Sequence, residues 1–380
     1  MESFPTDERD ARLLLGLYSK FGPVRFARLV ARFGSAAGAF AAPERDWASV
    51  EGIGGEAAAH RRALSQMVAG LEREKSRATR AGARWITALD AEYPASFREL
   101  RDAPPVLYLW GSLKPVDSVS VALVGTRHPS PYGRAAAERL ARELTQAGVP
   151  VVSGLARGID TAAHTAALEA GGRTIGILGS GLAAFYPREN RRLAERMAAS
   201  GAVVTEFPLD APPDASHFPR RNRLIAALAL GTVVVEAREK SGALITAHLA
   251  AEQGKDVFAV PGSIFSPGSR GPHRLLNEGA RLVESAEDLL GEIRPLVELV
   301  HAGRALSKVP ADGAAELSPE ARRLLAALDL DPAGIDAVAR RSGLPIQEVT
   351  VSLLTLELAG FARQLPGKQF VRSERSLSAR

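Results

Sequence analysis

Cysteine is absent from the 380-residue chain. Disulfides, thiolate catalysis and cysteine-ligated metals are therefore excluded. The 7 histidines are scattered, and no two lie four residues apart on a predicted helix, so we expect no histidine metal site. The sequence shows no signal-peptide pattern and no apolar run long enough to span a bilayer. We therefore expect a cytoplasmic protein with no membrane contact.

Lysine is scarce, because only 7 of the 48 basic residues are lysine and the rest are arginine. The formal net charge of +5 and the isoelectric point near 9.7 permit a polyanionic partner without proving one. Arginine suits bidentate contacts with phosphate. A G+C-rich genome would favour the same residue, so the positions of the arginines are more informative than their number.

Several common nucleotide-binding and catalytic motifs are also missing. The chain has no GxxxxGK[ST] motif, the loop GTRHPSPYG departs from GxGxxG, and the GSG at residues 179–181 lacks the GxSxG spacing. Glu206 and Glu236 remain as possible acid or base residues, but we expect them to bond loop amides or arginines and shape a pocket. We therefore predict no catalytic residue, no metal and no cofactor.

The length indicates two or three domains. Residues 1–85 read as small helices, a domain similar to SAM or helix-hairpin-helix domains, in which VEGIGG forms a turn. Residues 86–292 alternate short apolar runs with helical patterns, which predicts an α/β domain with a doubly wound, mostly parallel sheet and VLYLW as an edge strand. Residues 293–317 are predicted to be a linker and 373–380 a disordered tail. The three helices and hairpin predicted over 318–372 indicate a winged helix.

Cations and glycines follow the predicted strands of the central domain. The carboxyl ends of parallel strands share one edge, where ligands bind in open α/β sheets. In the loops of the opposite edge we find one basic residue, Lys255. We therefore predict an anion-binding groove at the carboxyl edge. Its candidate residues are Gly125, Thr126, Arg127, His128, Gly154, Arg157, Gly158, Arg188, Asn190, His217, Arg220, Arg221, Asn222, Arg223 and Lys240.

Aromatic residues are interleaved with these cations. The stretch HFPRRNRLIAALA predicts a helix whose first turn carries several cations, where backbone N–H groups add to the attraction for phosphate. Cations beside aromatic faces suit a single-stranded nucleic acid, because exposed bases can stack while arginines meet phosphates. The aromatic residues near the predicted groove are Tyr132, Phe185, Tyr186, Phe207 and Phe218.

Six motifs between about residues 85 and 290 carry a family resemblance. In chain order they are GTRHPSPYG, SGLARGIDTAAH, YPREN, HFPRRNRLIAALA, SGALITAHLAAEQGKDVFAVPG and GPHRLLNEGA. Together they resemble the DNA-processing protein A family (DprA, also called Smf). The resemblance implies an extended Rossmann-like domain that binds and protects single-stranded DNA, loads the RecA recombinase during natural transformation, dimerises through this domain and catalyses no reaction. It also implies DNA contacts by Arg127, Arg157, which replaces a lysine common in the family, and the HFPRRNR arginines.

Two other functions stay open. The sheet and the SGALITA loop also resemble nucleoside-monophosphate phosphoribohydrolases, although EKSGALITA lacks the glycine pair and trailing glutamate of their PGGxGTxxE loop. A duplex-DNA transcription factor is the third candidate. The predicted third helix of the winged helix has no Lys or Arg and carries Glu348 and Glu357, so we expect it to contact protein. Nearby basic residues leave a DNA contact open, namely Arg340, Arg341, Arg363 and Lys368.

Overall fold

The computed structural model describes residues 4–18, 20–293, 296, 318–329, 333–358, 361–365 and 369–372. The chain divides into two compact units, Met1–Ala286 and Glu287–Arg380, each of which is described by itself. The predicted tail lies outside the described residues, as does the predicted linker apart from Ile293 and Leu296.

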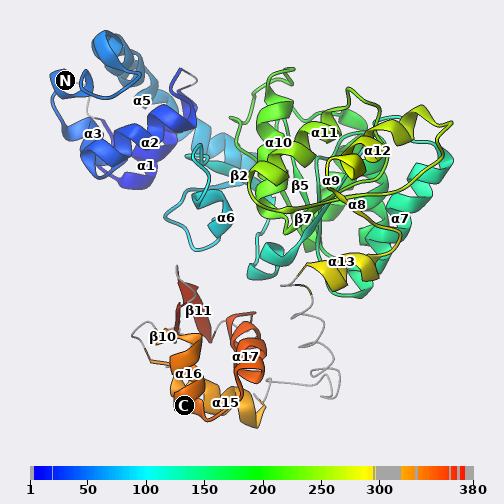
Figure 1. Ribbon diagram of the computed structural model, residues 1–380. Helices are drawn as coiled ribbons and strands as arrows, with labels where there is room; N and C mark the ends of the chain where they lie inside the picture. Colours follow the sequence, from blue (N-terminus) through cyan, green and yellow to red (C-terminus); the bar gives the residue numbers. More distant parts are fainter. Residues whose placement is uncertain are drawn as a thin grey trace. The chain divides into compact units, whose positions relative to one another are not determined.

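Helices fill the amino-terminal part of the first unit (Figure 1). Trp47 is buried between the rings of Phe21 and Phe40, and its indole N–H donates to the carbonyl oxygen of Ala39 at 2.6 Å. The VEGIGG stretch forms the turn into the longest of these helices. The elements are α1 (Glu8–Leu17), α2 (Gly22–Phe33), α3 (Ala36–Ala41), α4 (Glu44–Trp47), η1 (Gly54–Glu56) and α5 (Ala57–Arg80).

Helix α5 also joins the helical part to the central sheet. Glu74 accepts a hydrogen bond from the hydroxyl of Tyr108 at 3.0 Å, and Arg77 forms an ion pair with Asp210. Apolar residues of α1, α5 and the sheet, among them Tyr108, belong to one continuous core. The helices therefore cover part of one face of the sheet.

The central sheet has the order β1-β2-β6-β5-β4-β3-β7-β8-β9. The pairs β1–β2 and β2–β6 are antiparallel, and all other strand pairs of this sheet are parallel. The doubly wound, mostly parallel sheet predicted from the sequence is confirmed. The prediction that VLYLW is an edge strand is wrong. This stretch forms β2, and β1 pairs with it on its outer side. The strands are β1 (Arg84–Ile86), β2 (Leu107–Gly111), β3 (Val121–Val124), β4 (Val151–Ser153), β5 (Thr174–Ile177), β6 (Ala202–Thr205), β7 (Gly231–Val234), β8 (Asp256–Ala259) and β9 (Arg281–Leu282).

Helices cover both faces of this sheet, which explains why its strands read as continuous apolar runs. Ala122 and Val124 point into a core shared with α10, α11 and α12. The chain places β4, β5 and β6 on one side of β3 and then returns to place β7 on the other. The junction of β3 and β7 is thus the switch point, where a crevice opens at the carboxyl ends of strands. The helices are α6 (Ala95–Arg98), α7 (Pro131–Gln146), α8 (Ile159–Glu169), α9 (Arg191–Ser200), α10 (His217–Leu228), α11 (Gly242–Glu252) and α12 (Arg270–Asn277), with the short turns η2 (Pro115–Val119), η3 (Arg188–Asn190) and η4 (Pro267–Ser269). A further helix, α13 (Ala286–Glu292), begins at the last residue of the first unit and belongs otherwise to the second.

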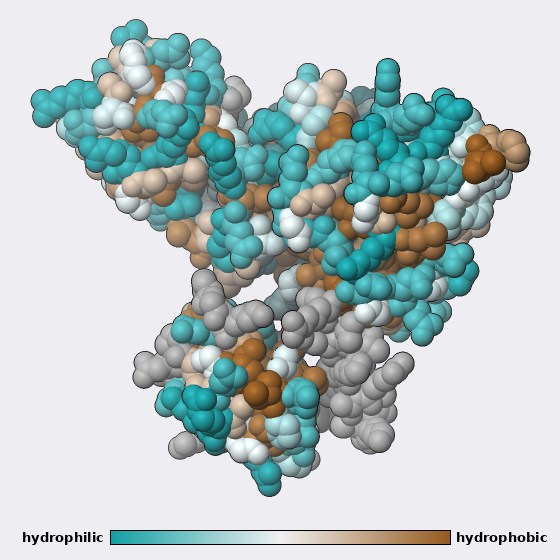
Figure 2. Space-filling view, in the orientation of Figure 1, coloured by the Kyte–Doolittle hydropathy of each residue, from teal (hydrophilic) through white to brown (hydrophobic). Residues whose placement is uncertain are grey.

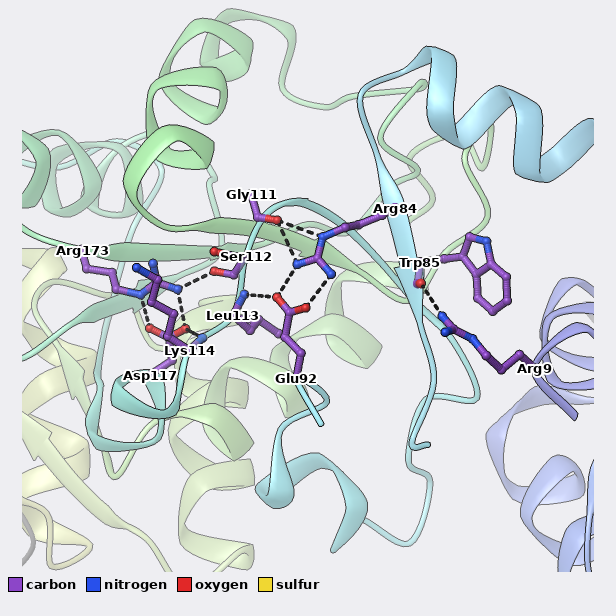
Figure 3. Close-up of polar contacts among 10 residues, drawn as sticks. All are labelled: Arg9, Arg84, Trp85, Glu92, Gly111, Ser112, Leu113, Lys114, Asp117 and Arg173. Carbon is purple, nitrogen blue, oxygen red and sulfur yellow. Dashed lines mark hydrogen bonds and ion pairs between the residues drawn. The ribbon is translucent and has the colours of Figure 1, made fainter. Parts of the chain in front are cut away.

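At the amino-terminal edge of the sheet, Arg173 links several segments of the chain by hydrogen bonds and an ion pair (Figure 3). Arg173, just before β5, forms a two-pronged ion pair with the buried carboxylate of Asp117 in η2, at 2.5 and 2.7 Å. Its other N–H groups donate to the carbonyl oxygens of Ser112 and Ser200. Lys255 is therefore not the only basic residue at the edge opposite the predicted groove. The hydrogen-bond donors of Arg173 are, however, used within the protein and not offered to a ligand.

The second unit contains the predicted three helices and hairpin, and a short strand, β10, that was not predicted. Ser318 caps α15 by accepting from the backbone N–H of Ala321 at 3.1 Å. Glu357 is not a free surface acid, because it accepts from the backbone N–H of Gln364 at 2.9 Å, and burial raises its pKa. The elements are α15 (Pro319–Ala327), β10 (Ala333–Gly334), α16 (Ile335–Ser342), α17 (Ile346–Leu358), β11 (Ala362–Leu365) and β12 (Gln369–Arg372), with sheet order β10-β12-β11.

The sequence analysis left open a DNA contact of this unit through four basic residues. Two of these, Lys368 and the side chain of Arg363, lie outside the described part of the chain. Across both units, no helix among the described residues is long and apolar enough to cross a membrane.

Candidate nucleic-acid interface

Three loops at the switch point interlock. The backbone N–H of Thr126 donates to the carbonyl oxygen of Glu236 at 2.7 Å, and that of Ile159 donates to the carbonyl oxygen of Thr126 at 3.1 Å. Gly158 has a φ of +84°, and a Cβ there would lie 2.3 Å from the carbonyl oxygen of Thr126. A side chain at this position is therefore excluded by both conformation and space. The loop that carries Arg127 is held between the loops after β4 and β7.

Arg127 is the cation that these loops present to solvent. Its side chain is exposed, and its guanidinium lies 5.2 Å from the centre of the Phe218 ring. Among the described residues, no carboxylate forms an ion pair with it. The neighbouring His128 is exposed as well, and its backbone N–H donates to the Thr126 hydroxyl at 3.2 Å. The hydrogen-bond donors of Arg127 are thus available to a ligand.

A cavity of about 380 Å³ opens beside Arg127, between the loops after β3 and β7. This is the crevice expected at the switch point. A smaller pocket next to it is shared by Arg127, Gly154, Arg157, Tyr186 and Phe218. The polar and charged residues of the larger cavity are Thr126, Arg127, His128, Asp160, Arg221, Asn222, Arg238, Lys240, Ser241 and Thr246.

Arg221 forms part of the cavity wall but is buried. Its guanidinium donates to the carbonyl oxygens of Gly154 and Ile177, and burial lowers its pKa to about 10, so it stays charged at neutral pH. Asp160 accepts from the backbone N–H of Gly154 at 3.1 Å, and burial raises the pKa of its carboxyl group. Arg221 therefore adds positive potential to the cavity while its bonds hold two strand ends.

Asn222 lies next to Arg221 in the cavity wall. Its side-chain oxygen accepts from Arg221 Nε at 3.1 Å, and its Nδ2 donates to the carbonyl oxygen of Gly242 at 3.2 Å. Asn222 is therefore also bonded within the protein.

The YPREN segment sits against the loop after β4. Asn190 is buried and donates to the carbonyl oxygen of Leu155 at 2.8 Å and to the Thr161 hydroxyl at 2.9 Å. This segment also places Glu189 in an ion pair with Arg157, and both side chains are half-exposed. The bond from Arg157 lowers the pKa of Glu189. Arg157 thus has an acidic partner that a bound phosphate must displace.

Arg188 precedes Glu189 and is exposed. No ion pair involving Arg188 is found in the described part of the chain, so its charge is free to attract a phosphate.

Helix α10 begins at His217, so the predicted helix start in HFPRRNR is confirmed. His217 stacks on Phe207 with centroids 4.0 Å apart, and the exposed Arg220 lies over the same ring at 5.2 Å. Arg223 is buried and forms ion pairs with Glu206 at 2.6 Å and Asp102 at 2.9 Å.

Of the three arginines in HFPRRNR, the structure therefore exposes Arg220 and buries Arg221 and Arg223. Helix α10 packs against the sheet, so only the side chains on its outer face can reach solvent.

The two candidate acid or base residues are engaged as expected. Glu206 binds Arg223, and Glu236 accepts from the backbone N–H and hydroxyl of Ser130 at 2.9 and 3.0 Å. Glu236 is buried, and the side chain of Glu206 is only 2% exposed. Neither one lines the cavity beside Arg127.

Arg238 is a site residue that the sequence analysis missed. It is exposed and lines the same cavity as Lys240, from the loop after β7. The signal was present, because Arg238 follows the end of a predicted strand just as Arg127 does. No group of three or more His, Asp or Glu side chains that could hold a metal ion occurs among the described residues.

Comparisons with known proteins fit this geometry. The family model of the DNA recombination-mediator protein A matches residues 84–294, and that of the DprA winged helix domain matches residues 308–368. The chain is 42% identical to the protein Smf of Escherichia coli over 289 residues, which are 76% of this chain and 77% of that protein. It is 46% identical to the DNA processing protein DprA of Streptococcus pneumoniae over 54% of this chain and 73% of that protein.

Two DNA processing proteins are among the solved structures that resemble this one. DNA processing protein A from Streptococcus pneumoniae superposes with a TM-score of 0.66 at 36% identity, over 74% of this chain and 98% of that chain. The Helicobacter pylori protein, reported for its single-stranded DNA binding mode, superposes with a TM-score of 0.51 at 32% identity, over 57% of this chain and 98% of that chain. Because the family model spans more than half of the chain, this protein belongs to the DNA recombination-mediator protein A family, whose curated members are called DprA or Smf.

Proposed function

We propose that this protein binds single-stranded DNA along the carboxyl edge of its central sheet. The observation that carries the proposal is the exposed Arg127, stacked on Phe218 at the mouth of a cavity that also takes in Arg238 and Lys240. A phosphate can meet the guanidinium while a base lies against the aromatic ring. The binding mode reported for the Helicobacter pylori relative supports the same assignment.

Single-stranded DNA fits this edge better than a duplex. Arg220 lies over the buried ring of Phe207, but Arg127 lies over Phe218, one of the rings that stay partly exposed to solvent. Such rings stack with unpaired bases, whereas the bases of a duplex already stack on one another. Family membership extends the proposal to a mediator that protects incoming strands in natural transformation and loads the RecA recombinase. We further propose a homodimer formed through the central domain and a winged helix that contacts protein.

An oligo-dT titration against salt tests the binding function. We expect the affinity for oligo-dT to exceed that for duplex DNA of equal length and to fall steeply with salt, because phosphate contacts release counterions. If Arg127, Arg220, Arg238 and Lys240 each neutralise one phosphate, the slope of log K against log salt should be about −3. Fluorescence anisotropy measures both quantities. Equal affinity for duplex, or binding that does not change with salt, would contradict the proposal.

A hydrolase of nucleoside monophosphates is the alternative on this kind of sheet. Asp160 is the only carboxylate among the described residues that line the cavity, and it is buried and bonded to loop amides. We therefore expect no free base when the protein is incubated with nucleoside monophosphates, as measured by chromatography. Clear turnover, lost on substitution of Asp160 in a protein that still folds, would favour the hydrolase.

A further inference from the structure

Two large apolar side chains lie on the loop after β8 with almost no protein around them. Phe265 is 90% exposed and Ile264 78%, more than any other large apolar residue in the described part of the chain. Figure 2 shows a brown patch at the right-hand edge of the larger unit, where Figure 1 draws the yellow-green loop that precedes α12. Exposed apolar groups framed by polar ones mark binding sites.

This loop is held in place by several hydrogen bonds. The hydroxyl of Tyr132 donates to the carbonyl oxygen of Pro261 at 2.6 Å, and the ring of His273 hydrogen-bonds to the carbonyl oxygen of Gly262 at 3.1 Å. Within the loop, the backbone N–H of Phe265 donates to the Ser263 hydroxyl at 3.2 Å. The base of the loop is therefore fixed, and the phenyl ring is held in water where a ligand can reach it.

The position of the loop indicates which ligand. Strand β8 pairs with β7, and β7 pairs with β3, so Phe265 lies on the same edge as Arg127, two strands away. Adjacent strands are about 4.8 Å apart, which places the bases of the two loops about 10 Å apart. The exposed Arg238 and Lys240 lie on the loop between them. Positive charges therefore lie between the cavity beside Arg127 and the ring of Phe265.

We propose that Phe265, with Ile264 beside it, is a stacking platform for a base of the same DNA strand, outside the cavity. The inference rests on the proposed function and extends its site. A hollow of about 620 Å³ at the foot of the loop, lined by Ser263, Ser266 and Ser269, offers hydroxyl groups to the edge of such a base. Two side chains are far fewer than the 20–30 residues per partner of a typical protein interface, about 800 Å² a side, which favours a base over a protein.

The length of the DNA oligonucleotide distinguishes binding at the platform from binding at the cavity. Phe265→Ala should weaken binding of a long oligo-dT, about 16 nucleotides, roughly tenfold. It should leave the affinity for a dinucleotide unchanged, because a dinucleotide is too short to reach from the cavity to the ring. Phe265→Trp should retain the long-strand affinity, because the indole ring also stacks. 2-Aminopurine scanned along the long strand should be quenched at one position by the unsubstituted protein and recover its emission with Phe265→Ala.

The matched control is Leu89→Ala. Leu89 is 54% exposed and follows β1, at the other end of the sheet, so its replacement should change neither affinity. Equal long-strand affinity of Phe265→Ala and the unsubstituted protein would overturn the platform while leaving the proposed function intact. The platform would also be rejected if Phe265→Ala abolished self-association in sedimentation velocity without changing DNA affinity, because the patch would then bind a second copy. Failure of the unsubstituted protein to bind oligo-dT of any length would instead reject the proposed function.

Discussion

Arg127→Ala is expected to weaken the binding of oligo-dT by about 10- to 100-fold, the range for losing a hydrogen bond to a charged group. The melting temperature should not change, because the side chain is exposed and forms no ion pair with a described residue. Since one phosphate contact disappears, the salt slope should also become shallower by about 0.7. Anisotropy titrations at several salt concentrations and a thermal melt measure these effects.

Arg142→Ala is the control for this loss of charge. Arg142 is exposed on α7, the helix that follows the Arg127 loop, but lies near the end of that helix away from the cavity. Its replacement should reduce affinity only slightly. If both variants lost the same affinity, the effect of Arg127 would reflect net charge, and a direct contact would be contradicted.

Arg223→Ala is expected to destabilise the protein by about 3–5 kcal/mol, because it leaves a buried charge without its partner. The side chain of Glu206 is only 2% exposed. Among the described residues, its remaining cationic partner would be Arg220, whose guanidinium lies 3.5 Å away. Urea denaturation followed by circular dichroism measures the loss. Arg220→Ala is the matched control, since the same charge is removed from the same helix at an exposed position. It should weaken DNA binding and leave the midpoint of unfolding nearly unchanged.

The destabilisation should depend on pH in a defined direction. Burial raises the pKa of Glu206, and Arg223 opposes that rise, so its removal raises the pKa further. A carboxyl group whose pKa is higher in the folded than in the unfolded protein contributes stability that is lost as pH rises between the two values. The deficit of Arg223→Ala should therefore grow as the pH rises above the ordinary pKa of a glutamate, about 4.3. Adding Glu206→Gln should remove most of this pH dependence; a deficit that stayed constant with pH would contradict the account.

The fold could be predicted from the sequence because parallel strands covered on both faces read as short apolar runs. Both the doubly wound sheet and the helix start at His217 follow from such local patterns. The error at VLYLW has a local cause too. Strand β1 has only three residues, one of them exposed, so its pattern is too weak to predict that it pairs with β2.

The site was harder to predict, because burial and pairing depend on distant segments. The stretch HFPRRNR looks like a uniform row of cations, yet Arg223 meets Asp102 and Glu206, which come from other parts of the chain. Glu189 reaches Arg157 across a gap of 32 residues. Local spacing indicates which loops carry cations, but not which cations find a carboxylate when the sheet assembles.

The interlocking of the three loops at the switch point affects how a strand is bound. A Cβ at Gly158 would collide with the Thr126 carbonyl oxygen, and Thr126 in turn bonds the backbone of Glu236, so no loop can shift alone. The binding surface is thus preorganised, and little affinity is lost to ordering it. For such a surface, substitutions at the cavity change mainly the rate at which the strand dissociates, while the rate of association follows the surrounding charge.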